Sequence, residues 1–254
     1  MASRRLRLIP PLLALAAALA ILPAAAGAQC RQAGLAVAVD AGHGPKAPGA
    51  TSARGLPEYG FNRRLAGQVV AALRAAGFPR AFLLDPDGRD LPPAARAARA
   101  NAAGAGLLVS IHHDAVQPRY LETWTVDGQP RRFCDRFAGY SLFYSGRNPF
   151  AAQSLELARA IGRELTAAGL PFTRHHAEAI PGEGRPLVDD SVGVYRYDGL
   201  AVLAGARAPA VLVEAGVIVN RAEEAELAGA ARQEQTARAV AKGVERWCAA
   251  QNGR

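Results

Sequence analysis

The sequence has 254 residues, of which 20% are charged, and its 30 basic and 22 acidic side chains give a formal net charge of +8. Lysine is nearly absent and alanine is abundant, which is typical of a genomic composition bias, so the excess of arginine does not by itself indicate a nucleic-acid-binding protein. After the first 28 residues no apolar run is long enough for a membrane helix. The remaining length of about 225 residues suits one α/β domain, which we expect to be a monomer.

Residues 1–28 have the three parts of a signal peptide. Three arginines precede an apolar run over residues 12–22, which is too short to span a bilayer comfortably. Ala26-Gly27-Ala28 is a suitable cleavage site, and cleavage there would lower the formal charge from +8 to +5. We therefore expect export to the periplasm or cell envelope, by the general secretory or the twin-arginine route.

Export would permit a disulfide between two of the three cysteines. Cys30 lies just before the first predicted strand, and Cys248 ends the last predicted helix. A helix that packs antiparallel to a strand ends at the edge where that strand begins, so both cysteines should lie at one edge of the sheet. We predict a Cys30–Cys248 disulfide, with Cys134 left as a free or partly buried thiol.

Strands and helices alternate along the rest of the chain, which favours a single-domain α/β fold with a mostly parallel sheet and helices on both faces. Arg96 and Arg99 are predicted to mark the solvent face of the second helix. The predicted strands are 35–39, 81–84, 106–111, 140–144 and 210–213; the predicted helices are 65–73, 91–103, 151–168 and most of 221–249. The catalytic domain should cover 29–254, with irregular insertions near 116–138 and 170–192.

Polar side chains follow three of the predicted strands. His43 comes after the first, His112 after the third and Glu214 after the last, and Glu58 precedes a helix. Ligands of open α/β sheets bind beyond the carboxyl ends of the strands. A catalytic zinc site needs three nitrogen or oxygen ligands, which His43, Glu58 and His112 would supply, and Glu214 would then carry the proton. His43 could instead be an ordinary loop histidine, and Glu58 a helix N-terminal acid.

The other histidines are weaker ligand candidates. His113 directly follows His112, and if the strand continues through both, their side chains point to opposite faces, so at most one of them should bind the metal. His175 and His176 fall in an irregular segment and are minor candidates. The pattern therefore favours His112, with His113 as a packing or surface residue.

Four motifs occur in order along the chain: Asp40-Ala-Gly-His43-Gly44, Glu58 with Asn62, Ser110-Ile-His112-His-Asp114, and Val213-Glu214-Ala-Gly216 through Asn220. Together they resemble the motifs of the zinc-dependent N-acetylmuramoyl-L-alanine amidases, a family of cell-wall hydrolases. The resemblance implies zinc bound by His43, Glu58 and His112, Glu214 as the catalytic acid/base, and hydrolysis of the amide between N-acetylmuramic acid and L-alanine. It also implies an α/β sheet with flanking helices.

The resemblance also implies partners. Peptidoglycan or muropeptides would be the substrate, and a protein activator is conceivable because some relatives carry a segment that covers the zinc. The two insertions are candidates for substrate walls or for such a lid, and our hypothesis for a lid places Glu178 or Glu183 near the metal. The favoured alternative is an ordinary surface loop. Two alternatives remain open: a zinc carboxypeptidase-like peptidase, which needs a clamp for a substrate carboxylate, and a non-catalytic wall-binding module, which would lack a ligand or the acid/base.

Overall fold

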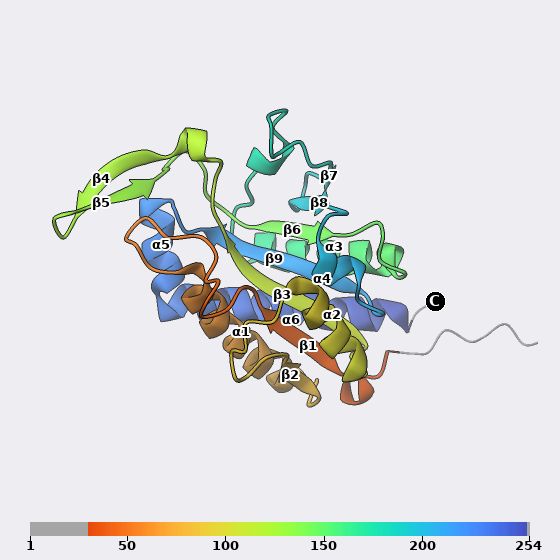
Figure 1. Cartoon of the computed structure of the whole chain (residues 1–254). Helices are drawn as coiled ribbons and strands as arrows, with labels where there is room; N and C mark the ends of the chain where they lie inside the picture. Colours follow the sequence, from red (N-terminus) through yellow and green to blue (C-terminus); the bar gives the residue numbers. More distant parts are fainter. Residues whose placement is uncertain (1–29, 253–254) are drawn as a thin grey trace, which may run out of the picture.

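A seven-stranded sheet forms the centre of the computed structural model, which describes residues 30–252 (Figure 1). The strand order is β2-β1-β3-β9-β6-β8-β7. Strands β2, β1, β3 and β9 are parallel, β6 is antiparallel to β9 and parallel to β8, and β7 is antiparallel to β8. The predicted mostly parallel sheet is confirmed. The strands are β1 (Val37–Ala41), β2 (Ala81–Leu83), β3 (Leu107–Asp114), β6 (Ser141–Tyr144), β7 (Leu187–Asp189), β8 (Val194–Arg196) and β9 (Ala210–Val217).

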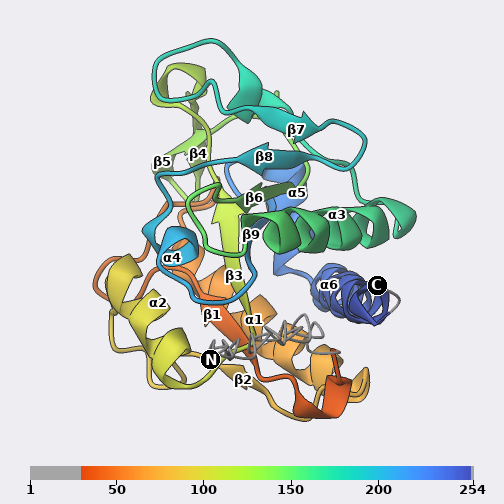
Figure 2. The same ribbon diagram turned by 90° about the vertical axis from the view of Figure 1, so that its right-hand side faces the viewer.

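Helices cover both faces of this sheet, as predicted (Figure 2). One face packs against α1, α3 and α6, and the other against α2 and α4. In strands β1 and β3 successive side chains alternate between the two cores, so Val37 and Val39 face the first group of helices and Ala38 and Leu108 face the second. The helices are α1 (Glu58–Ala75), α2 (Pro93–Ala102), α3 (Ala151–Ala167), α4 (Ala201–Ala204), α5 (Arg221–Ala228) and α6 (Ala230–Gln251).

Two strands are longer than the sequence predicted. Strand β3 continues through His112, His113 and Asp114, and β9 continues three residues beyond Glu214. Glu214 therefore lies within a strand rather than at its end. The predicted strands stop early because His112, His113 and Asp114 end β3 and because Glu214 interrupts the apolar run of β9, and apolar content is the signal from which strand length was predicted.

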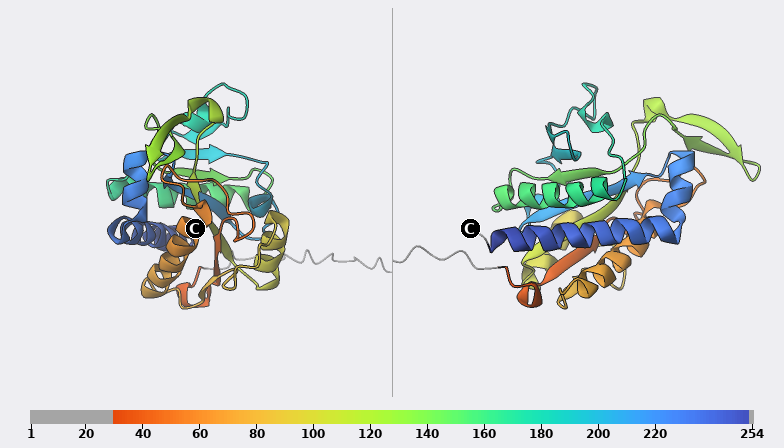
Figure 3. Two further views of the ribbon diagram at one scale, coloured as in Figure 1. Left: turned by 60° about the vertical axis from the view of Figure 1, so that its left-hand side comes forward. Right: turned by 180° about the vertical axis from the view of Figure 1, so that it is seen from behind.

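The segment 116–138 is more regular than predicted. Strands β4 (Glu122–Val126) and β5 (Gln129–Phe133) form an antiparallel hairpin that projects beyond the sheet (Figures 1 and 3). Its two-residue turn is Asp127-Gly128, and both residues have positive φ angles, as a type I′ turn requires. The Trp124 indole donates a 2.9 Å hydrogen bond to the Ala53 carbonyl, so the hairpin rests on the loop that leads into α1.

The two ends of the described chain are joined by a disulfide. Cys30 and Cys248 are bonded, with 5.3 Å between their Cα atoms, and Cys134 is a buried free thiol, so the predicted pairing is confirmed. The predicted signal peptide, residues 1–28, lies outside the described residues. Within 30–252, no helix has the length and apolar character needed to cross a membrane.

Replacing both Cys30 and Cys248 with serine should lower the free energy of unfolding by about 3–5 kcal/mol, because the bond closes a long loop and restricts the unfolded chain. Urea unfolding under non-reducing conditions measures this effect. The wild-type protein unfolded in the presence of a reductant is the matched control and should behave like the double variant. A difference below about 1 kcal/mol would show that the bond contributes little.

Candidate metal centre and active site

His43, Glu58 and His112 lie together at the carboxyl edge of β1 and β3. His43 Nε2 is 3.1 Å from Glu58 Oε2, and His112 Nδ1 is 3.1 Å from the other carboxylate oxygen, Oε1. The potential ligand atoms of the three side chains all lie within 4.8 Å of one another. Two imidazoles and one carboxylate are the donors of a known class of catalytic zinc site. The sequence predicted that these residues meet, and in the structure they do.

Gly42 and Gly49 have no side chains that would compete for the space occupied by His43, Glu58 and His112. A Cβ atom on Gly42 would lie 2.2 Å from the His112 ring, and one on Gly49 would lie 2.3 Å from Glu58 Oε2. His43 itself has a φ of 67°, a left-handed conformation that is uncommon outside glycine. Non-glycine residues in such conformations often occur at functional sites, where the surrounding structure holds them. The loop is thus shaped around the triad.

Glu58 is held in its ionised form by its neighbours. Ala50 N–H donates to Oε2 at 3.0 Å, and the Asn62 side-chain amide donates to Oε1 at 2.9 Å. Burial alone would raise the pKa of Glu58, but hydrogen bonds with His112 and His43 outweigh burial and hold the pKa well below its usual range. Asn62 lies one helical turn beyond Glu58 on α1, so the helix supplies both the carboxylate and the group that orients it.

His113 points away from His112, as expected for neighbours in a strand. It is buried, its Nδ1 lies 2.7 Å from Asn62 Oδ1, and its ring packs 5.5 Å from that of Phe61. Burial, more than any neighbouring charge, lowers the pKa of His113 to about 3. His113 is therefore a neutral core residue behind the triad, and the choice of His112 over His113 agrees with the geometry.

In metal-free protein the free energy of unfolding should fall between about pH 6.5 and about pH 3, partly because of His113. The unfolded chain protonates this histidine near pH 6.5, whereas the folded protein keeps it neutral to about pH 3. The full effect is about 5 kcal/mol. Urea unfolding at several pH values, with chelator present, should show a shallower decline for His113→Gln. Equal declines for variant and wild type would contradict this origin.

Arg96 anchors the His43 loop, and the prediction that it marks a solvent face is wrong. Its guanidinium is buried, and Nη1 donates to Asp40 Oδ1 at 2.8 Å and to the Ala41 carbonyl at 2.5 Å. Nη2 donates to the His43 carbonyl. Sequence reasoning missed this role because an arginine in an alanine-rich helix is usually solvated. The signal that could have found it is Asp40, an inward-facing acid on β1 that requires a buried partner.

Arg96→Met should lower the free energy of unfolding by about 3–5 kcal/mol, because it leaves the Asp40 carboxylate buried without its charge partner. The matched control is Arg99→Met on the same helix. Arg99 pairs with Asp85 in a more exposed position, so its loss should cost less than about 1 kcal/mol. Equal losses for the two variants in urea unfolding would contradict the anchoring role.

Glu214 faces the triad from the adjacent strand. It is the direct neighbour of His112 in the β3–β9 register, so both side chains leave the same face of the sheet. Its Oε2 atom is buried and has no hydrogen-bond partner among residues 30–252. Burial, and then the negative charges of Asp114 and Glu58, raise the pKa of Glu214 well above its usual value. A buried, unpartnered carboxyl oxygen on the same face of the sheet as His112 is placed for proton transfer beside the triad.

The segment 170–192 forms a separate cluster instead of covering the triad. His175 and His176, in a short 3₁₀ turn (His175–Ala177), converge on Asp114 at the end of β3. Burial would lower the pKa of His176, but Asp114 and then Glu183 raise it to about 9. These histidines, expected as minor candidates for the triad, therefore belong elsewhere.

The expectation that Glu178 or Glu183 approaches the metal is not met. Glu183 Oε2 lies 3.0 Å from His176 Nδ1 and 2.7 Å from Arg185 Nη1. Glu178 accepts a 2.8 Å hydrogen bond from the Tyr120 hydroxyl, which precedes the β4–β5 hairpin. Glu183 Oε1 also accepts a 2.8 Å hydrogen bond from the Gln117 side-chain amide, so both carboxylates tie the segment 170–192 to the segment 116–138 and neither contacts the triad.

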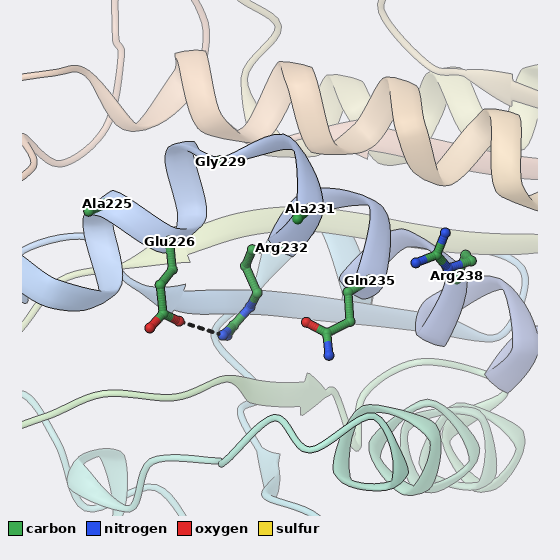
Figure 4. A pocket seen from close by; sticks show the side chains of 7 residues that line it. All are labelled: Ala225, Glu226, Gly229, Ala231, Arg232, Gln235 and Arg238. Atoms are coloured by element: carbon green, nitrogen blue, oxygen red, sulfur yellow. Dashed lines mark hydrogen bonds and ion pairs between the residues drawn. The ribbon is translucent and has the colours of Figure 1, made fainter.

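A cavity of about 360 Å³ adjoins the triad and includes His43 and His112 in its wall. Asp40, Arg96 and the start of α2 form the opposite side. Another hollow, of about 490 Å³, lies between α5 and α6 (Figure 4). Its wall carries Arg232 and Glu226, which face one another, but it contains no member of the triad. Of these two hollows among the described residues, the one beside the triad is the better placed to hold a reacting group.

Comparison with known proteins places this site in a family. The family model described as N-acetylmuramoyl-L-alanine amidase matches residues 37–246. The N-acetylmuramoyl-L-alanine amidase AmiC of Neisseria meningitidis is 27% identical over 230 residues, covering 83% of this chain and 52% of that protein. An N-acetylmuramoyl-L-alanine amidase of Mycobacterium tuberculosis is 28% identical over 261 residues, covering 93% and 95%.

The fold agrees with the sequence comparisons. The crystal structure of an N-acetylmuramyl-L-alanine amidase from Mycobacterium smegmatis superimposes with a TM-score of 0.65 at 24% identity, covering 86% of this chain and 98% of that one. This chain spans about half the length of the Neisseria relative and nearly all of the M. tuberculosis relative. Since the family model covers most of the sheet and its helices, the chain belongs to the N-acetylmuramoyl-L-alanine amidase family.

Proposed function

We propose that this protein hydrolyses the amide bond between N-acetylmuramic acid and L-alanine, in peptidoglycan or in muropeptides released from it. Family membership gives the reaction class. The observation that carries the proposal for this chain is the convergence of His43, Glu58 and His112 at one sheet edge, with Glu214 facing them from β9.

We infer that His43, Glu58 and His112 would hold a zinc ion. Their nitrogen and oxygen donors suit zinc, Glu58 is ionised, and Gly42 and Gly49 leave space that a larger residue would fill. When bound, zinc supplies Lewis-acid polarisation of the scissile carbonyl. Asn62 orients Glu58, and Arg96 fixes the backbone of His43, so hydrogen bonds would hold two of the three donors in place for the metal.

Glu214 would move the proton that amide hydrolysis requires. At Oε2 it accepts a proton from the attacking water and delivers it to the leaving nitrogen of L-alanine, which departs as a free amine. The unpartnered, buried Oε2 atom supports this role, because no other described residue competes for it. Because β9 pairs with β3 in a register that makes Glu214 the direct neighbour of His112, this pairing would hold the carboxyl beside His112 during the reaction.

The surrounding segments suggest where substrate and partners act. The β4–β5 hairpin and the segment 170–192, tied together through Tyr120 and Glu178, would form walls for a muropeptide, and a protein activator would act through them. A disulfide supports export to the periplasm or cell envelope, where such bonds persist and where the substrate is found.

Digestion of defined muropeptides, followed by mass analysis of the products, tests the proposal. The expected products are a free lactyl carboxylate on the sugar and a stem peptide with a free N-terminal L-alanine, formed without chelator and lost with it. Release of a carboxyl-terminal amino acid would instead indicate a carboxypeptidase-like enzyme. Binding of wall fragments without any product would indicate a non-catalytic module.

A further inference from the structure

Asp114, His175 and His176 form a second cluster of ligand-type side chains outside the candidate active site. All three are buried, and their potential ligand atoms lie within 4.8 Å of one another. Both histidines present Nε2 to one carboxylate oxygen: Asp114 Oδ2 is 2.7 Å from Nε2 of His176 and 3.3 Å from Nε2 of His175. The two imidazole centroids are 4.0 Å apart. Buried charged and polar groups converge in this way when they share a partner.

The Nδ1 atom of each imidazole, on the other side of the ring from Nε2, already has a hydrogen-bond partner. His176 Nδ1 lies 3.0 Å from Glu183 Oε2, and His175 Nδ1 lies 2.9 Å from Thr173 Oγ1. Glu183 is itself fixed by Arg185, whose Nη1 donates to it at 2.7 Å. A histidine that gives its Nδ1 proton to an acceptor keeps a free lone pair on Nε2, which is the arrangement that supports metal-ligating imidazoles.

A metal-free ion pair explains only part of this cluster. A protonated His176 between Asp114 and Glu183 would satisfy those two carboxylates. His175 is less well accounted for, because its buried Nε2 lies 3.3 Å from Asp114 Oδ2 without good hydrogen-bond geometry, and His176 already contacts that oxygen at 2.7 Å. A buried donor or acceptor without a partner is costly, so a ligand that engages His175 Nε2 accounts for more of the geometry.

We propose that Asp114, His175 and His176 bind a second divalent transition-metal ion, separate from the His43–Glu58–His112 triad. Ligand atoms around a tetrahedral zinc ion are separated by roughly 3.3 Å, given bonds of about 2.0–2.1 Å, and the two distances from Asp114 Oδ2 to the histidines, 2.7 Å and 3.3 Å, are close to this value. The three ligands are buried and would leave a fourth coordination position, which a water molecule would fill. The site anchors the segment 170–192, which has little regular structure, to the end of β3.

Metal analysis of the untagged protein tests the proposal without relying on activity. Protein loaded with Zn²⁺ and dialysed into metal-free buffer should hold about two equivalents in the wild type and about one in His43→Ala, which disables only the triad. His43→Ala/His175→Gln should hold none. The matched control, His43→Ala/His113→Gln, also replaces a buried histidine but should keep its equivalent, since His113 belongs to neither cluster.

Thermal unfolding distinguishes the loss of a metal ligand from misfolding of the variant. At a hundredfold excess of Zn²⁺ over its Kd, the His43→Ala protein should melt about 5 °C or more higher than without metal, and His43→Ala/His175→Gln should show no rise. A natively folded His43→Ala protein, judged by circular dichroism, that binds no zinc and shows no rise would overturn the proposal. Retention of the equivalent after His175→Gln would overturn the assigned ligands.

Discussion

Replacing Glu214 with glutamine should lower the rate of muropeptide hydrolysis by a factor of about 10² to 10⁴, because glutamine keeps the shape of the side chain but cannot carry a proton. The metal content should not change, since Glu214 is not one of the three triad ligands. Product formation from a defined muropeptide, measured beside metal analysis of the same preparation, gives both quantities. A variant that retains its metal and hydrolyses the muropeptide at the normal rate would show that Glu214 does not carry the proton.

The matched control for this experiment is Glu223→Gln. Glu223 is also a buried glutamate of raised pKa, but it accepts hydrogen bonds from the backbone of Gly139 and Val217 and does not face the triad. Its replacement should change the rate only a few-fold, through stability. Comparable losses in the two variants would mean that the Glu214 effect comes from disturbing a buried carboxyl rather than from proton transfer.

His43→Ala should remove one equivalent of metal per chain and lower the hydrolysis rate by at least about a thousandfold, because a catalytic metal contributes several kcal/mol of transition-state stabilisation. Excess Zn²⁺ should not restore the rate. The readouts are metal content after dialysis and single-turnover product formation. Hydrolysis at the normal rate by a variant whose triad is metal-free would contradict a metal-dependent reaction.

His113→Gln is the neighbouring control for the metal experiment. His113 is adjacent to a proposed ligand in sequence, yet it faces the opposite core and contacts Asn62. This variant should keep its triad metal, although Asn62 loses one partner. If His113→Gln lost the triad metal to the same extent as His43→Ala, the assignment of His112 rather than His113 as the ligand would be contradicted.

The sequence was most informative where local periodicity decides the structure. Alternation along β3 separates His112 from His113, and the antiparallel packing of α6 against the sheet leads to the disulfide. The positions of His43 and His112 followed from the rule that parallel strands present their carboxyl ends at one edge, and Glu58 was placed there from the start of the first helix. The β4–β5 hairpin could also have been predicted from the sequence, since Asp127-Gly128 is a strong signal for a two-residue hairpin turn.

The parts that were missed depend on contacts between segments distant in the chain. Arg96 is 56 residues from Asp40, and nothing in the pattern of α2 distinguishes it from a solvated arginine. Asp114 and His176 are 62 residues apart, and the segment holding His176 has no period from which to place it. Such pairings are set by tertiary packing, for which the residues next to them in sequence carry little information.

The position of the disulfide has a practical consequence for work on insoluble substrate. Helix α6 ends beside Cys30, which precedes β1, whereas His43 follows the carboxyl end of β1 at the other edge of the sheet. A tether or an added module joined after α6 would leave the reacting edge unobstructed. Protein immobilised through that end should therefore present its cavity to suspended wall fragments, and a reporter fused there would follow the enzyme without shielding it from them.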